Sequence, residues 1–317
     1  YLCLKKPKDQ PQQFLKLTHR PHFFRKSVFL FLSAGILIIF QLIDSFFVFN
    51  SLVDSGVPAL EAMKLKGSFD RGLPIVQTAT VFTSAIVSST IPQMAGLTDI
   101  KKRKKVFNFA LFLVLLLSIP ACVGLFSVVD ELNIALFKDN SGVEALKILT
   151  IQILFYPFIF LSTAVMQQEG QYSRLVMSVL AGILVKIGLT APLTMEMGIS
   201  GAAISSVAAL GIMAVINLFQ FKKMIYRQSI LTLIKVLFST LGLWMTLDYL
   251  GPQIPTILSG MDDVRMYNVI SLAIQVMAGV TVYGLIMGIF LMTTKVAGKG
   301  AKRRKKKAKN VKSIAKV

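Results

Sequence analysis

The chain has 317 residues, of which 54% are hydrophobic, and a mean hydropathy of +0.68. These values lie well above those of soluble domains and exclude an ordinary water-soluble globular protein. The net charge of +20 is concentrated in short Lys/Arg blocks between apolar runs. That arrangement indicates membrane topology, and we expect no nucleic-acid partner.

Cysteine and histidine residues give no sign of a disulfide or a metal centre. Cys3 lies in a basic segment and Cys122 inside an apolar run, so we expect them to stay apart. His19 and His22 both lie near the start of the chain, and no metal-ligand spacing occurs. The sequence therefore predicts neither cofactor nor metal, and it offers no catalytic residue for an enzyme.

The start of the chain is polar and basic. Residues 1–26 are predicted to be a basic cytoplasmic linker, and the absence of an initiator Met suggests that a longer protein precedes them. The first spanning helix is expected at 27–49, with Asp44 near its exit end. A charge at a helix centre costs about 2.5–3.5 kcal/mol on insertion scales, so Asp44 needs a partner or water. Two interpretations are open: an ion pair with Arg71, or a coupling-ion or proton site.

A polar stripe distinguishes the second predicted helix, 72–95, which follows a predicted loop at 50–71. Gln77, Thr80, Ser84 and Ser88 recur at spacings of three and four, and therefore share one helical face. Lipid cannot hydrogen-bond such a stripe, so it must face other helices or water. It is either part of a transport pathway, with Arg71 at its mouth, or a polar seam between packed helices.

Six further spans are expected, at 106–128, 146–167, 175–193, 199–219, 230–250 and 269–294. Lys186 is embedded in the middle of the fifth span, where it should face a cavity or a buried carboxylate. Residues 295–317 form a predicted lysine-rich cytoplasmic tail. That tail either binds anionic membrane lipids or only sets the topology.

The distribution of Lys and Arg residues between the loops tests whether these eight spans cross the membrane in alternating directions. The loops on the side of residues 1–26 carry 27 Lys and Arg residues, and the opposite loops carry six. The positive-inside rule then places both ends of the chain in the cytoplasm of a multi-pass protein of the cytoplasmic membrane.

Two segments resemble a known family. QLIDSFFVFNSLVDSG at 41–56 and KLKGSFDRGLPIVQTATVFTSAIVSSTIPQMA at 64–95 are similar to the polysaccharide-exporter and lipid II flippase branch of the MOP superfamily, in particular its MurJ-, SpoVB- and YtgP-like members. Such proteins have fourteen helices, in two six-helix lobes followed by two additional helices. The resemblance implies an all-α polytopic membrane protein in which 27–220 is the second lobe and 230–294 the two additional helices. The missing N-terminal lobe would then be a partner of this piece.

The family resemblance also implies a function. It predicts a bacterial flippase that moves undecaprenyl-diphosphate-linked sugar precursors, lipid II or a polysaccharide repeat unit, across the cytoplasmic membrane by alternating access. Arg71 matches a basic cavity residue of MurJ-like flippases, whose guanidinium would pair with the diphosphate. Helices 230–250 and 269–294 would form the groove for the polyprenyl tail.

The predicted substrate-binding residues are Asp44, Arg71, Gln77, Ser84 and Lys186. For Arg71, the alternative is an interfacial residue paired with Asp70 or with a lipid phosphate. Two other functions remain open: a cation-coupled multidrug exporter of the same superfamily, and a membrane-embedded glycosyl- or acyltransferase.

Overall fold

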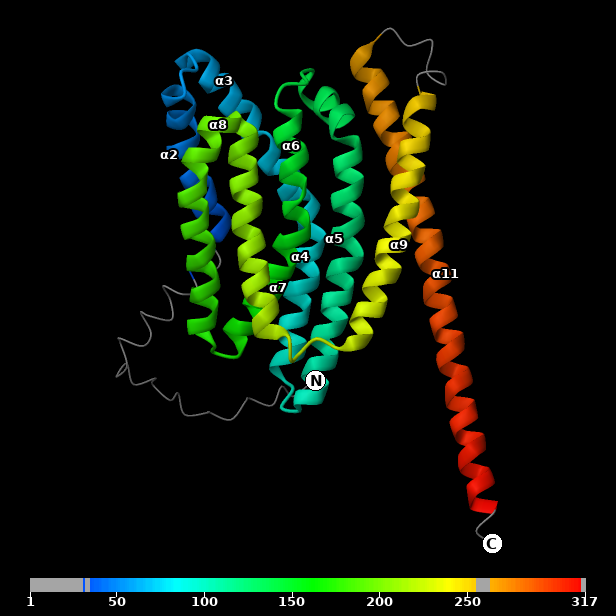
Figure 1. Cartoon of the computed structure of the whole chain (residues 1–317). Helices are drawn as coiled ribbons and strands as arrows, with labels where there is room; N and C mark the ends of the chain where they lie inside the picture. The colour runs from blue at the N-terminus through cyan, green and yellow to red at the C-terminus, as the bar shows by residue number, and fades with distance from the viewer. Residues whose placement is uncertain (1–30, 32–34, 255–262, 315–317) are drawn as a thin grey trace, which may run out of the picture.

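The structure, a computed structural model, describes Phe31 and residues 35–254 and 263–314; the predicted linker at 1–26 lies outside these. The described residues form a bundle of long helices that run up and down side by side (Figure 1). In chain order the elements are α2 (Ile36–Asp54), α3 (Ala59–Asp70), α4 (Gly72–Ala95), α5 (Ile100–Phe137), α6 (Val143–Thr150), α7 (Gln152–Gln168), α8 (Tyr172–Phe221), α9 (Arg227–Leu250), the 3-10 turn η1 (Gly251–Gln253) and α11 (Val264–Ile314).

Helix α8 is in fact two antiparallel arms. Its 50 residues would span about 75 Å at 1.5 Å per residue, far more than the roughly 30 Å core of a bilayer. Gly198 breaks it with non-helical angles (φ 62°, ψ −144°), and the chain reverses there. The described part of the chain has seven helical segments long and apolar enough to cross a membrane. With the two arms of α8 counted separately, the all-α, eight-span prediction agrees with the structure.

Two predicted boundaries were wrong. The segment 50–71 was predicted as a loop, yet α2 continues to Asp54 and residues 59–70 form α3. Charged residues concealed this helix, although Ala62 and Phe69, seven positions apart, are fully buried on one face. The predicted third span is also longer, since α5 covers residues 100–137.

The predicted lysine-rich tail at 295–317 is helical as far as Ile314, because α11 continues to that residue. Lysine, arginine and alanine, which dominate this segment, all favour helix formation. In Figure 1 this part of α11 extends beyond the ends of the other helices.

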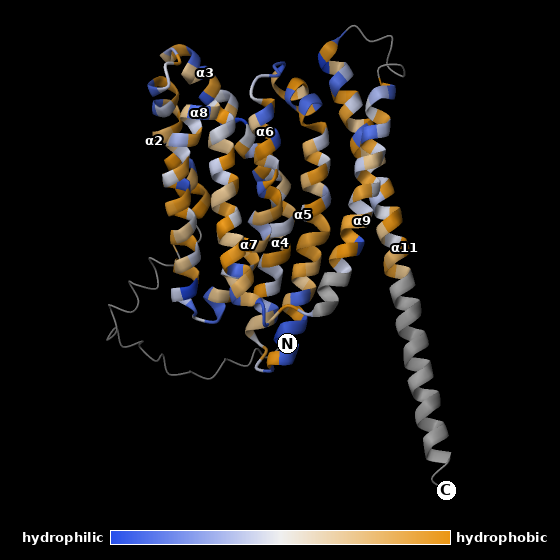
Figure 2. Cartoon of the chain, in the orientation of Figure 1, coloured by the Kyte–Doolittle hydropathy of each residue, from blue (hydrophilic) through white to orange (hydrophobic). Residues whose placement is uncertain are grey.

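The loops group at the two ends of the bundle as the alternation of spans requires. Hydrophobic residues fill the middle of the bundle and hydrophilic ones gather at its ends (Figure 2). At one end, Arg103 Nη2 bonds Glu169 Oε1 at 2.8 Å, and the Tyr226 amide donates to Asn108 Oδ1 at 2.8 Å. These contacts bring together the start of α5, the α7–α8 turn and the α8–α9 link, which carry the basic blocks. We call this end the basic end.

Helices α9 and α11 stand together against α5, apart from the main core. The largest core cluster joins α2, α4, α5, α7 and α8 around side chains such as Phe107, Leu161 and Leu210. Two smaller clusters join α9 and α11 to α5. As a result, α9 and α11 meet the main bundle along one side of α5.

Candidate functional site

Asp44 and Lys186 form a buried ion pair in the middle of the bundle. Asp44 shares the buried face of α2 with Phe40 and Val48, four residues to either side, and Lys186 lies near the centre of the first arm of α8. Lys186 Nζ lies 2.5 Å from Asp44 Oδ1, and the two side chains are 0% and 3% exposed. The pair brings two opposite charges together where each alone would be costly in the membrane.

Oxygen atoms of the second α8 arm complete the surroundings of the Lys186 ammonium. It donates to Ser206 Oγ at 2.5 Å, to Ser205 Oγ at 3.1 Å and to the Ala202 carbonyl at 3.5 Å. The Phe40 ring centroid lies 6.0 Å from Nζ. The pair therefore joins α2 to both arms of α8.

The predicted pairing of Asp44 with Arg71 was wrong. The sequence placed Asp44 near the exit end because the first helix was expected to stop at residue 49. Since α2 continues to Asp54, Asp44 lies ten residues, or about 15 Å, before the helix end. The expectation that Lys186 faces a buried carboxylate is confirmed.

Arg71 lies at the junction of α3 and α4, and its carboxylate partner is Asp139. Its Nη1 lies 3.1 Å from Asp139 Oδ2, and its guanidinium carbon lies 4.9 Å from the centroid of the Phe137 ring. The alternative partner Asp70 instead binds Lys66 at 2.6 Å. Arg71 keeps 32% of its side chain exposed and lines an open pocket of about 450 Å³. A polar ligand therefore has access to it.

The α5–α6 loop positions the Asp139 carboxylate for its contact with Arg71. Its carboxylate accepts hydrogen bonds from the Ser141 hydroxyl and, at 3.0 Å, from the Ser141 amide. Together with Arg71, these donors lower the pKa of Asp139 to about 2. Sequence reasoning missed this residue, although the Asp-Asn-Ser run at 139–141 is a turn signal.

The polar stripe of α4 lies along the edge of that helix's buried face. Thr80 is buried, Gln77 and Ser84 are half-buried, and Ser88 is exposed. The Thr80 hydroxyl donates to the Gln77 carbonyl at 2.8 Å, and the Ser84 hydroxyl to the Val81 carbonyl at 2.7 Å. These hydroxyls are satisfied by their own helix, which allows the stripe to border an apolar environment.

The five predicted site residues thus lie at separate places. Asp44 and Lys186 meet in the core, Gln77 and Ser84 lie on the flank of α4, and Arg71 lies at the end opposite the basic end. Among the described residues, no three His, Cys, Asp or Glu side chains are placed to hold a metal ion.

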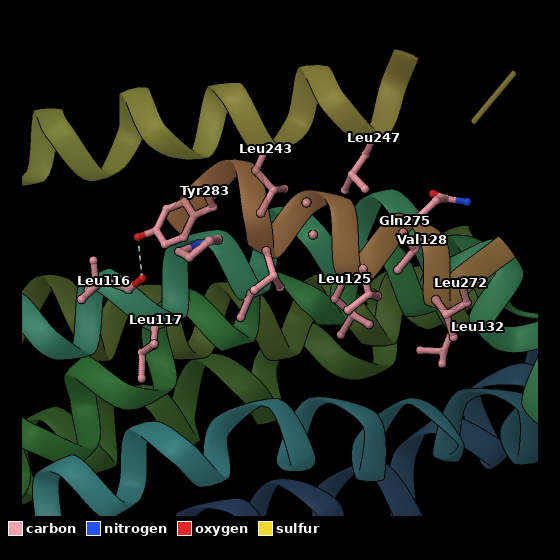
Figure 3. Close-up of a pocket in the computed structure, with 16 residues that line it drawn as sticks. Leu116, Leu117, Leu125, Val128, Leu132, Leu243, Leu247, Leu272, Gln275 and Tyr283 are labelled. Atoms are coloured by element: carbon pink, nitrogen blue, oxygen red, sulfur yellow. Dashed lines mark hydrogen bonds between the residues drawn. The ribbon is translucent and has the colours of Figure 1, made fainter. Parts of the chain in front are cut away.

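An apolar groove of about 420 Å³ lies between α5, α9 and α11 (Figure 3). Its walls are almost entirely aliphatic, with Leu117 and Leu125 from α5, Leu243 from α9 and Leu272 from α11. Two polar contacts fix α11 to α5 along it. The Tyr283 hydroxyl donates to the Leu116 carbonyl at 2.7 Å, and Gln275 Nε2 donates to Glu131 Oε1 at 3.1 Å.

Several solved structures are similar to most of this chain, among them the following three. The lipid II flippase MurJ, in an inward closed conformation, matches over 89% of this chain and 57% of its own, with 16% identity and a TM-score of 0.65. An outward-facing multidrug resistance MATE family transporter of the MOP superfamily matches over 82% and 63%, with 15% identity and a TM-score of 0.52. A MOP superfamily transporter from Pyrococcus furiosus matches over 83% and 62%, with 17% identity and a TM-score of 0.52.

Sequence comparison gives a shorter match. The uncharacterized membrane protein YabM of Bacillus subtilis (strain 168) is 32% identical over 200 residues, which is 62% of this chain and 37% of YabM. The chain thus spans little more than a third of that relative and about three fifths of each similar structure. No protein-family model matches the chain.

Proposed function

Since the chain has the fold of the membrane transporters of the MOP superfamily, we propose that it belongs to a flippase for undecaprenyl-diphosphate-linked sugars. The cargo would be lipid II or a polysaccharide repeat unit, carried across the bacterial cytoplasmic membrane by alternating access. An N-terminal lobe of the same protein would close the other side of the cavity, and the basic end would face the cytoplasm. No covalent chemistry is part of this proposal.

The apolar groove between α5, α9 and α11 is the observation that carries the proposal. A polyprenyl tail is a long hydrocarbon that needs an apolar path beside the moving headgroup, and the groove supplies one with about 420 Å³ of space. The lipid II flippase among the similar structures also matches a larger share of this chain than the other two do.

Arg71 is the proposed contact for the diphosphate. Its guanidinium is always charged and can bind phosphate oxygens through two parallel hydrogen bonds. Asp139 holds it at the open pocket while a third of its side chain remains accessible. Gln77 and Ser84 extend polar surface from Arg71 along α4, and the Asp44–Lys186 pair would preserve the shape of the lobe while it moves.

The test measures translocation of a lipid-linked diphosphate sugar by the complete parent protein, in cells depleted of their own flippase. We expect Arg71→Ala to abolish or strongly reduce translocation at normal expression, since a charge-assisted contact is lost. Arg174→Ala is the matched control, because it removes an arginine from the basic end, where its side chain bonds Gln171. Full activity of Arg71→Ala would make this residue an interfacial anchor.

The second candidate is a cation-coupled multidrug exporter, since a MATE family transporter has the same fold. Such an exporter would favour an unpaired carboxylate in the core of the bundle, whereas the buried Asp44 is neutralised by Lys186. A wild-type parent protein that moves no lipid-linked sugar but extrudes cationic dyes would establish this alternative.

The basic residues near the end of α11 are a further proposed contact. Eleven Lys and Arg residues follow position 294, most of them in the helix that continues to Ile314. Each basic residue near an anionic membrane surface contributes about 1 kcal/mol of attraction. We propose that this segment binds anionic lipids of the cytoplasmic leaflet.

A further inference from the structure

The apolar groove continues at one end into a separate polar pocket of about 320 Å³. Leu247 and Gln275 line both spaces, so the two share a wall. The pocket lies where α5 approaches its end and α9 turns into η1, at the end of the bundle opposite the basic end. An elongated molecule with an apolar tail and a polar head could therefore occupy both.

The charges in this pocket are unequal. Asp130, Glu131 and Asp248 supply three carboxylates, and Lys147 supplies one ammonium. Lys147 Nζ binds Asp130 Oδ2 at 2.7 Å, while Glu131 accepts only the neutral amide of Gln275. Two carboxylates therefore have no cationic partner in the part of the chain that the structure describes. The pocket favours a ligand with a positive group.

Two aromatic side chains also belong to the wall of the pocket. Phe126 and Trp244 line the pocket, and each is 45% exposed. The face of an aromatic ring attracts an ammonium group, and tryptophan does so most strongly. Aromatic rings of this kind also gather at the level of lipid headgroups.

The groove itself has the dimensions of a lipid chain. Its α5 wall extends from Leu116 to Leu132, which corresponds to about 24 Å of helix at 1.5 Å per residue. Val276 and Val280 line it while remaining 45% and 62% exposed, so the groove opens toward the surroundings of the bundle, where lipid lies. An acyl chain could enter sideways from the bilayer.

We propose that the groove and the polar pocket together bind one phospholipid with a primary-amine headgroup, of the phosphatidylethanolamine type. One acyl chain lies in the groove, and the ammonium binds Glu131 and Asp248 beside Trp244. The lipid phosphate binds Lys147, whose three N–H donors can serve it and Asp130 together. The presence of both signs of charge in one pocket favours this zwitterion over a simple cation, and the excess of carboxylates disfavours an anionic headgroup.

This inference depends on the groove and not on the transported cargo. If the proposed function is correct, the phospholipid fills the groove between transport cycles and a polyprenyl tail displaces it. The binding of the phospholipid can be measured without any translocation, so the two proposals can fail separately.

The chain's single tryptophan makes the site measurable, because Trp244 lies in the pocket. The 317-residue chain is reconstituted in phosphatidylglycerol bilayers, and an increasing fraction of lipid is replaced by lipid with brominated acyl chains, which quench tryptophan fluorescence on contact. Brominated phosphatidylethanolamine is compared with brominated phosphatidylglycerol carrying identical chains. We expect about fivefold preference for the amine lipid, the size expected of one partly exposed ion pair.

Two variants and a control locate the effect. Glu131→Gln combined with Asp248→Asn should abolish the preference while leaving the hydrogen bond to Gln275 possible. Gly124→Phe should weaken quenching by both lipids, since a Cβ at Gly124 meets only Leu243 at 3.9 Å and the ring then enters the groove. Asp54→Asn removes a charge from the same end of the bundle, on α2, and should leave the preference unchanged.

Several results would overturn the inference. Equal quenching by the two brominated lipids in the wild-type chain would mean that Trp244 senses only ordinary surrounding lipid. Stronger quenching by brominated phosphatidylglycerol would mean that the groove prefers anionic lipids. That result would agree with a diphosphate-linked cargo and would exclude the amine lipid as the preferred occupant. Saturable quenching by a brominated alkyltrimethylammonium, without preference between the two phospholipids, would make this a site for cationic amphiphiles.

Discussion

At the scale of single residues, Asp44 and Lys186 form the most buried ion pair in the described part of the chain. A buried pair contributes little net stability compared with an apolar pair, but the loss of one partner leaves an unpaired charge. The surface pair Lys66–Asp70, on one turn of α3, has a similar distance of 2.6 Å but remains hydrated. The two pairs therefore offer a matched comparison of burial.

We expect Lys186→Met to destabilise the chain by about 3–5 kcal/mol, because Asp44 is left charged in the core. Adding Asp44→Leu should recover most of that loss, since both charges are then gone. Lys66→Met should cost no more than about 1 kcal/mol. Reversible unfolding in mixed micelles measures all three. A double variant as unstable as Lys186→Met would show that the pair contributes a specific geometry and not only charge balance.

Asp139 allows a prediction of pH dependence. Its pKa is lowered to about 2 in the folded chain, below the value of about 3.9 for an unperturbed aspartate. The stability that it contributes is therefore fully present above about pH 4 and is lost as the pH falls toward 2. The stability difference between wild type and Asp139→Asn should shrink over this interval. A difference that stays constant down to about pH 2 would contradict the assignment of the lowered pKa to the Ser141 and Arg71 contacts.

At the scale of elements, the α8 hairpin depends on one close approach of backbone. A Cβ at Gly201 would lie 1.9 Å from the Leu193 carbonyl oxygen, so no side chain fits there without opening the turn at Gly198. Gly188 lies in the same helix, but a Cβ added there would meet nothing within 4 Å. The two glycines therefore have different roles.

Gly201→Ala should destabilise the chain by about 1–3 kcal/mol or more, as expected of overpacking against backbone. Gly188→Ala should be neutral or stabilising by up to about 1 kcal/mol, because alanine favours helix. Thermal unfolding in detergent compares the two variants. Equal effects would mean that the hairpin tolerates a wider turn.

At the scale of the whole molecule, the sequence predicted the helices better than the contacts between them. Long apolar runs fix the number of spans, because length and hydropathy alone decide whether a helix can cross a bilayer. The amphipathic helix α3 was missed because its charges outweigh its apolar face. The ion pairs were harder to predict than the helices. The sequence shows that Asp44 needs a partner, but whether that partner is Arg71 or Lys186 depends on where α2 ends.

The arrangement of the loops predicts how the chain lies in the membrane. Asn140, between α5 and α6, and Ser173, at the start of α8, lie at opposite ends of the bundle. In a background without Cys3 and Cys122, an impermeant thiol reagent applied to intact cells should label Asn140→Cys and spare Ser173→Cys. The reverse pattern would place the basic end outside and contradict the charge rule.

The separation of Asp44 and Lys186 along the chain has a consequence for biosynthesis. The two residues are 142 positions apart, and protein synthesis proceeds at about 5–20 residues per second. When Asp44 is added to the growing chain, Lys186 is therefore still about 7–28 s from being made. During that interval the Asp44 carboxylate cannot settle at the membrane centre with its final partner. Helix α2 must wait at the insertion machinery or near the lipid headgroups, and its place in the bundle is completed only when α8 arrives.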